Sequence, residues 1–120
     1  MLEESRQQVG RILGADVTSS SADSVIFTGS GTEANTLAVF GLIGGRTSPP
    51  GHMVISAIEH PSISAAADFL AGLDWRIDRL DVNRDGVARI EQLEDLLRGD
   101  TRLVAVMLGN NETGALQPVA

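Results

Sequence analysis

The 120-residue sequence contains no lysine, no cysteine and no tyrosine. Without lysine the chain cannot form a Schiff base with a carbonyl cofactor. Without cysteine it has no thiolate nucleophile, no disulfide and no sulfur ligand for zinc. Only two histidines are present, His52 and His60, so we expect no metal site built on a histidine cluster. These absences exclude several classes of catalytic centre from the chain itself.

Positive charge is also scarce. Nine arginines face sixteen acidic residues, which gives a formal net charge of -7. This balance argues against a nucleic-acid partner, which requires a basic face, and against an anionic membrane surface. The longest apolar runs, residues 37–45 and 103–109, are too short to span a membrane, and the first residues lack the pattern of a signal peptide. We therefore expect a cytoplasmic chain.

The composition, 42% hydrophobic and 21% charged, is that of a globular domain, and 120 residues is the length of one domain. Helical and strand patterns alternate along the chain, with a Gly/Pro-rich loop at 44–51. This alternation predicts an α/β fold with a mainly parallel sheet flanked by helices on both faces. Helices are predicted at 3–13, 32–42, 61–70 and 90–97 (with Ile90, Leu93, Leu96 and Leu97 facing inward), and strands at 24–28, 53–57, 75–80 and 103–108.

Three polar segments follow predicted strands: residues 29–33, 59–62 and 109–114. Ligands of parallel α/β sheets bind beyond the carboxyl ends of the strands. We therefore expect these segments to share one end of the sheet and to form the candidate site.

The first segment, Gly29-Ser30-Gly31-Thr32, joins a strand to a helix. Glycines let the backbone approach an anion closely, and a helix N-terminus offers free N–H donors. The hydroxyls of Ser30 and Thr32 can add hydrogen bonds, so the segment is a candidate phosphate cradle. A well-capped helix without a ligand, with Ser30 and Glu33 as a capping box, is an equally good interpretation.

His60 lies between a strand and a helix and precedes Pro61, which restrains it to an extended backbone. Its imidazole could stack on a planar ring or shuttle a proton. The alternative is a surface histidine at a helix start. His52, beside Pro50 and Gly51, has no such setting, and we expect it in a loop.

The third segment contains Asn110 and Asn111 between two glycines. Their amides can donate and accept hydrogen bonds to a ligand, although the same residues are common in turns. A second polar run, residues 81–86, resembles half of an EF-hand calcium loop. Its twelfth position is Gln92 instead of a glutamate, so we predict a turn and no metal site.

Taken together, three stretches resemble successive motifs of the cysteine desulfurases, which are class V aminotransferase-like enzymes dependent on pyridoxal 5'-phosphate (PLP). The order and spacing of the motifs match, and the resemblance covers essentially all 120 residues. It implies that residues 1–120 are a fragment of an incomplete PLP-transferase-like large domain, with no second domain present. The stretches are Phe27-Thr-Gly-Ser-Gly-Thr-Glu-Ala-Asn35, Ser56-Ala-Ile-Glu-His-Pro-Ser62 and Met107-Leu-Gly-Asn-Asn-Glu-Thr-Gly114.

The resemblance implies roles for four residues. Gly31 and Thr32 would bind the phosphate of PLP, and His60 would stack on its pyridine ring and assist proton transfer. Asn111 would lie near the ring hydroxyl and the substrate carboxylate. Small departures from the family pattern occur at residues 29–30, at Thr36 and at Leu108.

The activity implied by the resemblance is conversion of L-cysteine to L-alanine, with the sulfur held as an enzyme persulfide for iron–sulfur cluster assembly. A homodimer and a sulfur-acceptor protein would be the partners. The family's Schiff-base lysine and persulfide-forming cysteine, and the aspartate and glutamine that contact the cofactor, would all lie beyond Ala120, so this chain alone should not be catalytically competent.

Three alternatives stay open at this point. The first is another class V PLP enzyme, such as a selenocysteine lyase or a small-amino-acid aminotransferase. The second is a non-catalytic module that binds a phosphorylated ligand. The third is a structural or calcium-responsive domain.

Overall fold

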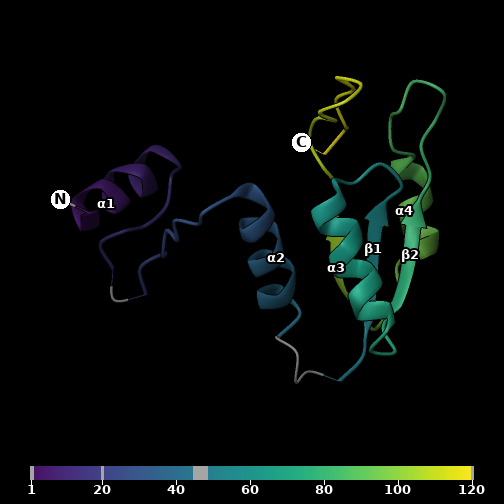
Figure 1. The fold of residues 1–120 in the computed structure, drawn as a ribbon, viewed down its shortest axis with the longest axis horizontal. Helices are drawn as coiled ribbons and strands as arrows, with labels where there is room; N and C mark the ends of the chain where they lie inside the picture. Colours follow the sequence, from purple (N-terminus) through teal and green to yellow (C-terminus); the bar gives the residue numbers. More distant parts are fainter. Residues whose placement is uncertain (1, 20, 45–48, 120) are drawn as a thin grey trace. The chain divides into compact units, whose positions relative to one another are not determined.

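The computed structural model describes residues 2–19, 21–44 and 49–119. The chain divides into two compact units, one ending at Ser30 and the other beginning at Gly31. Figure 1 traces the elements along the chain. The loop predicted for residues 44–51 falls partly outside the described residues.

The first unit is built on α1 (Leu2–Ile12), in agreement with the predicted helix. Ala15, Val17 and Val25 lie against the helix at Gly10, which is buried. A Cβ at Gly10 would lie 2.6 Å from Cγ1 of Val17, so the close approach depends on glycine. The guanidinium of Arg6 lies 5.7 Å from the ring centroid of Phe27, within the range of a cation–π contact.

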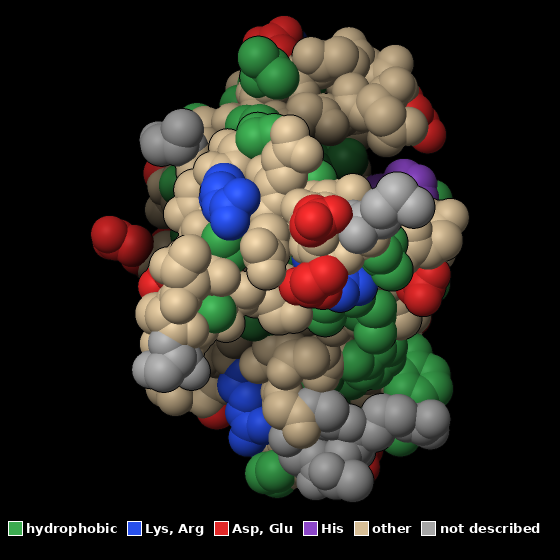
Figure 2. Space-filling model, turned by 90° about the vertical axis from the view of Figure 1, so that its left-hand side faces the viewer, with side chains coloured by type: hydrophobic (Ala, Val, Ile, Leu, Met, Phe, Trp, Pro, Cys, Tyr) green, Lys and Arg blue, Asp and Glu red, His purple; other side chains and the backbone are tan. Residues whose placement is uncertain are grey.

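The strand predicted for residues 24–28 is wrong, because the structure has no strand there. A strand requires a partner whose backbone accepts and donates the ladder hydrogen bonds. Ile26 is 70% exposed, so the apolar composition that suggested a buried strand is not matched by burial. Figure 2 shows hydrophobic side chains on the surface of one face of the molecule.

The second unit contains a parallel sheet of three strands in the order β2-β1-β3. These are β1 (His52–Ser56), β2 (Arg76–Leu80) and β3 (Thr101–Ala105). The central strand β1 is buried along its whole length, as expected for its apolar sequence. The predicted parallel sheet is therefore confirmed.

Successive residues of β1 face opposite layers of the fold. Met53 and Ile55 pack in a core with α2 (Gly31–Leu42) and α3 (Pro61–Ala71). Val54 points to the other face, where Leu80 and Ala88 pack with a 3-10 turn (Ile90–Gln92) and α4 (Leu93–Leu96). Helices thus cover both faces of the sheet, as the alternating pattern predicted.

Two predicted elements are shorter than the sequence indicated. The helix expected at 90–97 is split, and Leu97 has an extended backbone with its side chain 46% exposed, so it does not face inward as predicted. The strand expected at 103–108 ends at Ala105. Beyond it, the N–H of Met107 donates to Glu59 and the carbonyl of Leu108 accepts from Gln117, so these groups are used outside the sheet.

His52 does not lie in a loop, contrary to the prediction. It is the first residue of β1 and is fully buried. Its Nδ1 lies 2.7 Å from Oγ1 of Thr101, and its Nε2 lies 3.1 Å from a carboxylate oxygen of Asp78, which also accepts from Arg98. A buried polar side chain is tolerated when both of its ring nitrogens are hydrogen-bonded in this way.

None of the helices in the described ranges is long and apolar enough to cross a membrane.

Candidate functional site

The carboxyl ends of β1 and β3 are joined by the side chain of Glu59. Its Oε1 accepts a hydrogen bond of 2.6 Å from Oγ of Ser56, the last residue of β1. The same oxygen accepts one of 2.7 Å from the backbone N–H of Met107. One carboxylate therefore holds the segments after both strands at the same edge of the sheet, where the sequence predicted the site.

Asn110 joins the same two segments a second time. Its Nδ2 donates to the carbonyl of Ile58 at 3.3 Å, and its Oδ1 accepts from the backbone N–H groups of Glu112 and Thr113. This amide is therefore used to shape the loop. Asn111 is exposed, and none of the hydrogen bonds found among the described residues uses its side chain. Of the two neighbouring amides, Asn110 is thus the one that shapes the loop.

His60 caps the N-terminus of α3. Its backbone is extended, with φ -56° and ψ 143°, and its Nδ1 accepts the backbone N–H of Ser62 at 3.1 Å. Pro61 occupies the first helical position, where its missing N–H costs nothing. The predicted placement of His60 just outside the helix is confirmed.

Two residues that the sequence interpretation did not single out connect His60 to α2. Oγ of Ser62 lies 2.8 Å from Nδ1 of His60, and Nδ2 of Asn35 donates to that Oγ at 2.9 Å. Asn35 lies one turn beyond Gly31, the first residue of α2. The position of Ser62 in the first turn after a side-chain cap was a signal that could have identified it.

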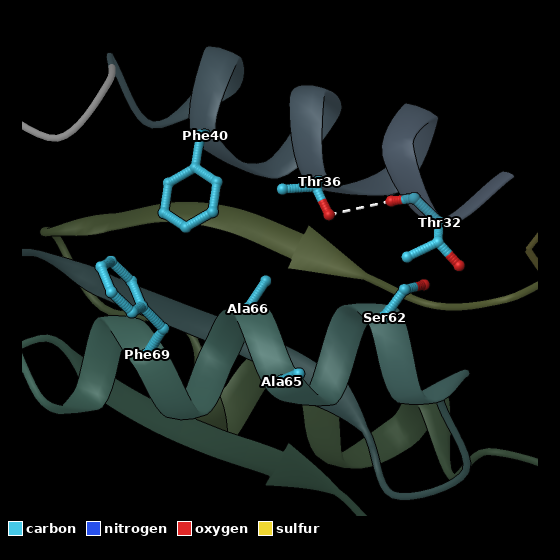
Figure 3. A pocket seen from close by; sticks show the side chains of 7 residues that line it. All are labelled: Thr32, Thr36, Phe40, Ser62, Ala65, Ala66 and Phe69. Carbon is cyan, nitrogen blue, oxygen red and sulfur yellow. Dashed lines mark hydrogen bonds between the residues drawn. The ribbon is translucent and has the colours of Figure 1, made fainter. Parts of the chain in front are cut away.

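Thr32 and Ser62 lie at the same end of a cleft of about 330 Å³ between α2 and α3. Figure 3 shows Phe40 and Phe69 at its other end, where their rings meet edge to face with centroids 5.6 Å apart. Thr36 donates to the carbonyl of Thr32 at 2.8 Å, which is a bond within the helix. The Thr32 side chain is exposed, and its hydroxyl enters no hydrogen bond recorded among the described residues.

A second groove, of about 370 Å³, runs between α2 and β3. Asn35, Glu59 and His60 form its polar end, and apolar side chains of α2 and β3 form the rest. Of the predicted site residues, Gly31 and Thr32 thus begin α2 and His60 caps α3. Asn35 and Ser62 link the two helices.

The other predicted positions are less closely joined. In the part of the chain that the structure describes, Asn111 has no hydrogen bond of its own to the segment before His60. Its neighbour Asn110 makes that connection, through the carbonyl of Ile58. Gly29 and Ser30 belong to the first unit. Among the described residues, no group of three or more histidine, aspartate or glutamate side chains is arranged to hold a metal ion.

The donor set at this end of the sheet suits a phosphate attached to a planar ring. The N-terminus of α2 offers backbone N–H groups, and Thr32 adds a hydroxyl. A Cβ built on Gly31 would meet no atom within 4 Å, so packing among the described residues does not explain the glycine. The imidazole of His60, fixed by its cap, provides a flat surface.

Comparison with known proteins identifies the family of the chain. Residues 1–120 match the family described as "Aminotransferase class-V". The chain is 33% identical over 118 residues to "Cysteine desulfurase IscS" of Dictyoglomus turgidum, an alignment that covers 98% of this chain and 29% of that protein. The chain therefore spans about 30% of the length of such relatives.

Solved structures agree with the match. A "NIFS-LIKE PROTEIN" superimposes with a TM-score of 0.81 at 26% identity, over 97% of this chain and 30% of that one. "SspA in complex with cysteine" superimposes with a TM-score of 0.68 at 32% identity, over 72% of this chain and 25% of that one. The predicted α/β, PLP-transferase-like fold is thereby confirmed as a partial domain. The chain belongs to the class V aminotransferase family, and the relatives that it resembles are cysteine desulfurases.

Proposed function

We propose that this chain provides the phosphate-binding and ring-stacking part of a PLP-dependent cysteine desulfurase. The observation that carries the proposal is the hydrogen-bonded connection Asn35–Ser62–His60, which ties the first turns of α2 to the histidine at the carboxyl end of β1. Phosphate donors and a planar side chain are thereby held at the edge of the sheet where α/β proteins bind ligands.

The residues present fit PLP. A phosphate dianion is matched by the N-terminal N–H groups of α2, the Thr32 hydroxyl and the open space at Gly31. The His60 ring would stack on the pyridine ring and hold or move a proton at Nε2, while Asn111 would donate to the ring hydroxyl or to a substrate carboxylate. When bound, PLP supplies an electron sink for a carbanion formed on an amino acid. The chain has no lysine to attach the cofactor covalently.

L-Cysteine is the proposed substrate of the complete enzyme, with L-alanine and a persulfide as products. Support comes from the relatives named as cysteine desulfurases and from the solved relative described as a complex with cysteine. A homodimer, a sulfur-acceptor protein, iron–sulfur cluster assembly and a cytoplasmic location belong to the same proposal.

The test is an assay of the product of the gene that encodes this chain, supplied with PLP and L-cysteine. We expect equal amounts of alanine and sulfide in the presence of a reductant. Thr32→Val should raise the apparent dissociation constant for PLP at least tenfold, because it removes a phosphate donor. The matched variant Thr36→Val should change it less than twofold, because the Thr36 hydroxyl is used within the helix.

Other outcomes would favour the alternatives. Turnover of selenocysteine alone, or transfer of an amino group to a keto acid, would replace the desulfurase by another class V enzyme. Saturable PLP binding without turnover of any amino acid would favour a binding module. The 120-residue chain by itself should release no sulfide, and release would contradict the assignment of catalysis to a lysine that this chain lacks.

A further inference from the structure

We propose that Asn35 and Ser62 are positioning residues that hold His60 in the tautomer protonated at Nε2. The inference deepens the proposed function, because it specifies which nitrogen of His60 carries the proton at the candidate site. The tautomer can nevertheless be observed without cofactor or substrate.

The first step concerns the acceptor nitrogen of His60. A backbone N–H can only donate, and the N–H of Ser62 points to Nδ1 of His60 at 3.1 Å. Nδ1 must therefore present its lone pair. In a neutral imidazole one nitrogen accepts and the other carries the proton, so the proton resides on Nε2.

The second step concerns the direction of the hydrogen bonds that reach this nitrogen. Because Nδ1 carries no proton, the Ser62 hydroxyl at 2.8 Å can hydrogen-bond to it only as the donor, and it shares the single lone pair of Nδ1 with the Ser62 N–H. Nδ2 of Asn35 is a donor and lies 2.9 Å from the same hydroxyl oxygen, so it occupies a lone pair of Oγ. Every bond of the chain Asn35→Ser62→His60 thus runs in one direction, and bonds aligned in this way strengthen one another.

The third step concerns competition with water. Ser62 is only 8% exposed, so its hydroxyl has few alternatives to His60. His60 itself is exposed, and its Nε2 takes no part in the cap. The Nε2–H group is therefore the one presented to a ligand. Since Asn35 lies on the helix that begins with Gly31 and Thr32, the same side chain links the proposed phosphate end to the orientation of the imidazole.

The sequence provides an internal reference for the experiment. His52 is the only other histidine of the chain. It is fully buried in β1 and is hydrogen-bonded to Thr101 and Asp78, not to Asn35 or Ser62. Its resonances report whether a variant keeps the fold of the second unit.

The experiment is a long-range ¹H–¹⁵N correlation spectrum of the ¹⁵N-labelled chain at about pH 8. We expect His60 to show the pattern of a single tautomer, with its proton on Nε2. Ser62→Ala keeps the backbone N–H that donates to Nδ1 but removes the hydroxyl contact. It should therefore move the Nδ1 resonance toward that of a nitrogen with fewer hydrogen bonds. Ser62→Thr, which restores a hydroxyl, should return the original pattern.

Asn35→Asp is the second variant, since it replaces the donor by an acceptor of the same shape at a half-buried position. We expect the Ser62 hydroxyl to turn toward the new carboxylate, and the Nδ1 resonance of His60 to move in the same direction as in Ser62→Ala. The His52 pattern should stay unchanged in both variants.

The inference is overturned if wild-type His60 shows the tautomer mixture of a free histidine. It is also overturned if Asn35→Asp and Ser62→Ala leave the His60 resonances in place while His52 reports an intact fold. If Ser62→Ala changes the His52 resonances and so disturbs the fold, the result for Asn35→Asp is the one that tests the inference. A chain that shows the expected tautomer but a gene product without desulfurase activity would refute the proposed function alone.

Discussion

The carboxylate oxygen Oε1 of Glu59 lies 2.7 Å from the backbone nitrogen of Met107, although 48 residues separate the two along the chain. The same oxygen accepts the hydroxyl of the fully buried Ser56. Glu59 thereby fixes where β3 leaves the sheet and sets the edge on which the candidate site stands.

Replacing Glu59 tests this role. Glu59→Ala leaves the buried Ser56 hydroxyl and the Met107 N–H without a partner, and each unpaired group costs about 1–3 kcal/mol. We expect a clear fall in the urea midpoint of unfolding. Glu59→Gln keeps an acceptor oxygen in place and should lose less than half as much. An equal loss in both variants would mean that the charge matters and not the bridge.

Gln117 supports the far side of the same edge. It is 4% exposed, its Oε1 accepts the N–H of Ala88 at 2.6 Å, and its Nε2 donates to the carbonyl of Gly86 at 3.0 Å. Gln117→Met has a similar volume but leaves these backbone groups unpaired, so we expect a loss of about 2–4 kcal/mol in the free energy of unfolding. Leu116→Met is the control, since Leu116 is 72% exposed. Similar urea midpoints for the two variants would contradict the role of the amide.

The ion pair between Asp78 and Arg98 predicts that the free energy of unfolding depends on pH. Burial raises the pKa of Asp78, but the hydrogen bond and charge of Arg98 and the contact with His52 outweigh it, so the pKa is lowered from 3.8. A lowered carboxyl pKa contributes stability that is present above pH 3.8 and is lost as the pH falls through the folded-state pKa. Asp78→Asn should therefore be less stable than the wild type at neutral pH.

This difference should shrink as the pH falls below 3.8, because the wild-type carboxyl then becomes neutral as well. Urea unfolding between about pH 7 and pH 2.5 measures it. Asp100→Asn is the matched control, since Asp100 pairs with Arg76 at 3.8 Å on the surface and such pairs contribute little. If the difference in stability between the wild type and Asp78→Asn is the same at all pH values, the ion pair is not its source.

The helices and the parallel sheet could be predicted because their signals are local. The pattern of 61–70, with Pro61 at its start, and the apolar run of β1 contain enough information by themselves. The segment 24–28 has the same kind of apolar run, yet it forms no strand. A strand depends on hydrogen bonds to a partner, and its own composition does not reveal whether the partner is present.

In the candidate site, too, residues with a local signal could be predicted and residues that depend on distant partners could not. His60 was identified because a proline fixes the backbone beside it. Asn35 and its partner Ser62 are 27 residues apart in the sequence, so their contact arises only when folding brings α2 against α3. Asn110 and Asn111 look equivalent in the sequence, and only the contact with the Ile58 carbonyl shows that Asn110 shapes the loop. The buried position of His52 was missed for the same reason, because both of its partners lie on other strands.

Two helical glycines give opposite predictions. An alanine normally stabilises a helix interior by about 1 kcal/mol relative to glycine. At Gly41, in the last turn of α2, a Cβ would meet no atom of the described residues within 4 Å, so Gly41→Ala should slow hydrogen exchange of the α2 amides. At Gly10 in α1 the added Cβ would lie 2.6 Å from Val17, whose branched side chain is stiff, and overpacking of this kind costs about 1–3 kcal/mol. Gly10→Ala should therefore speed exchange of the α1 amides. Slower exchange there would show that the packing of Val17 against α1 does not depend on glycine.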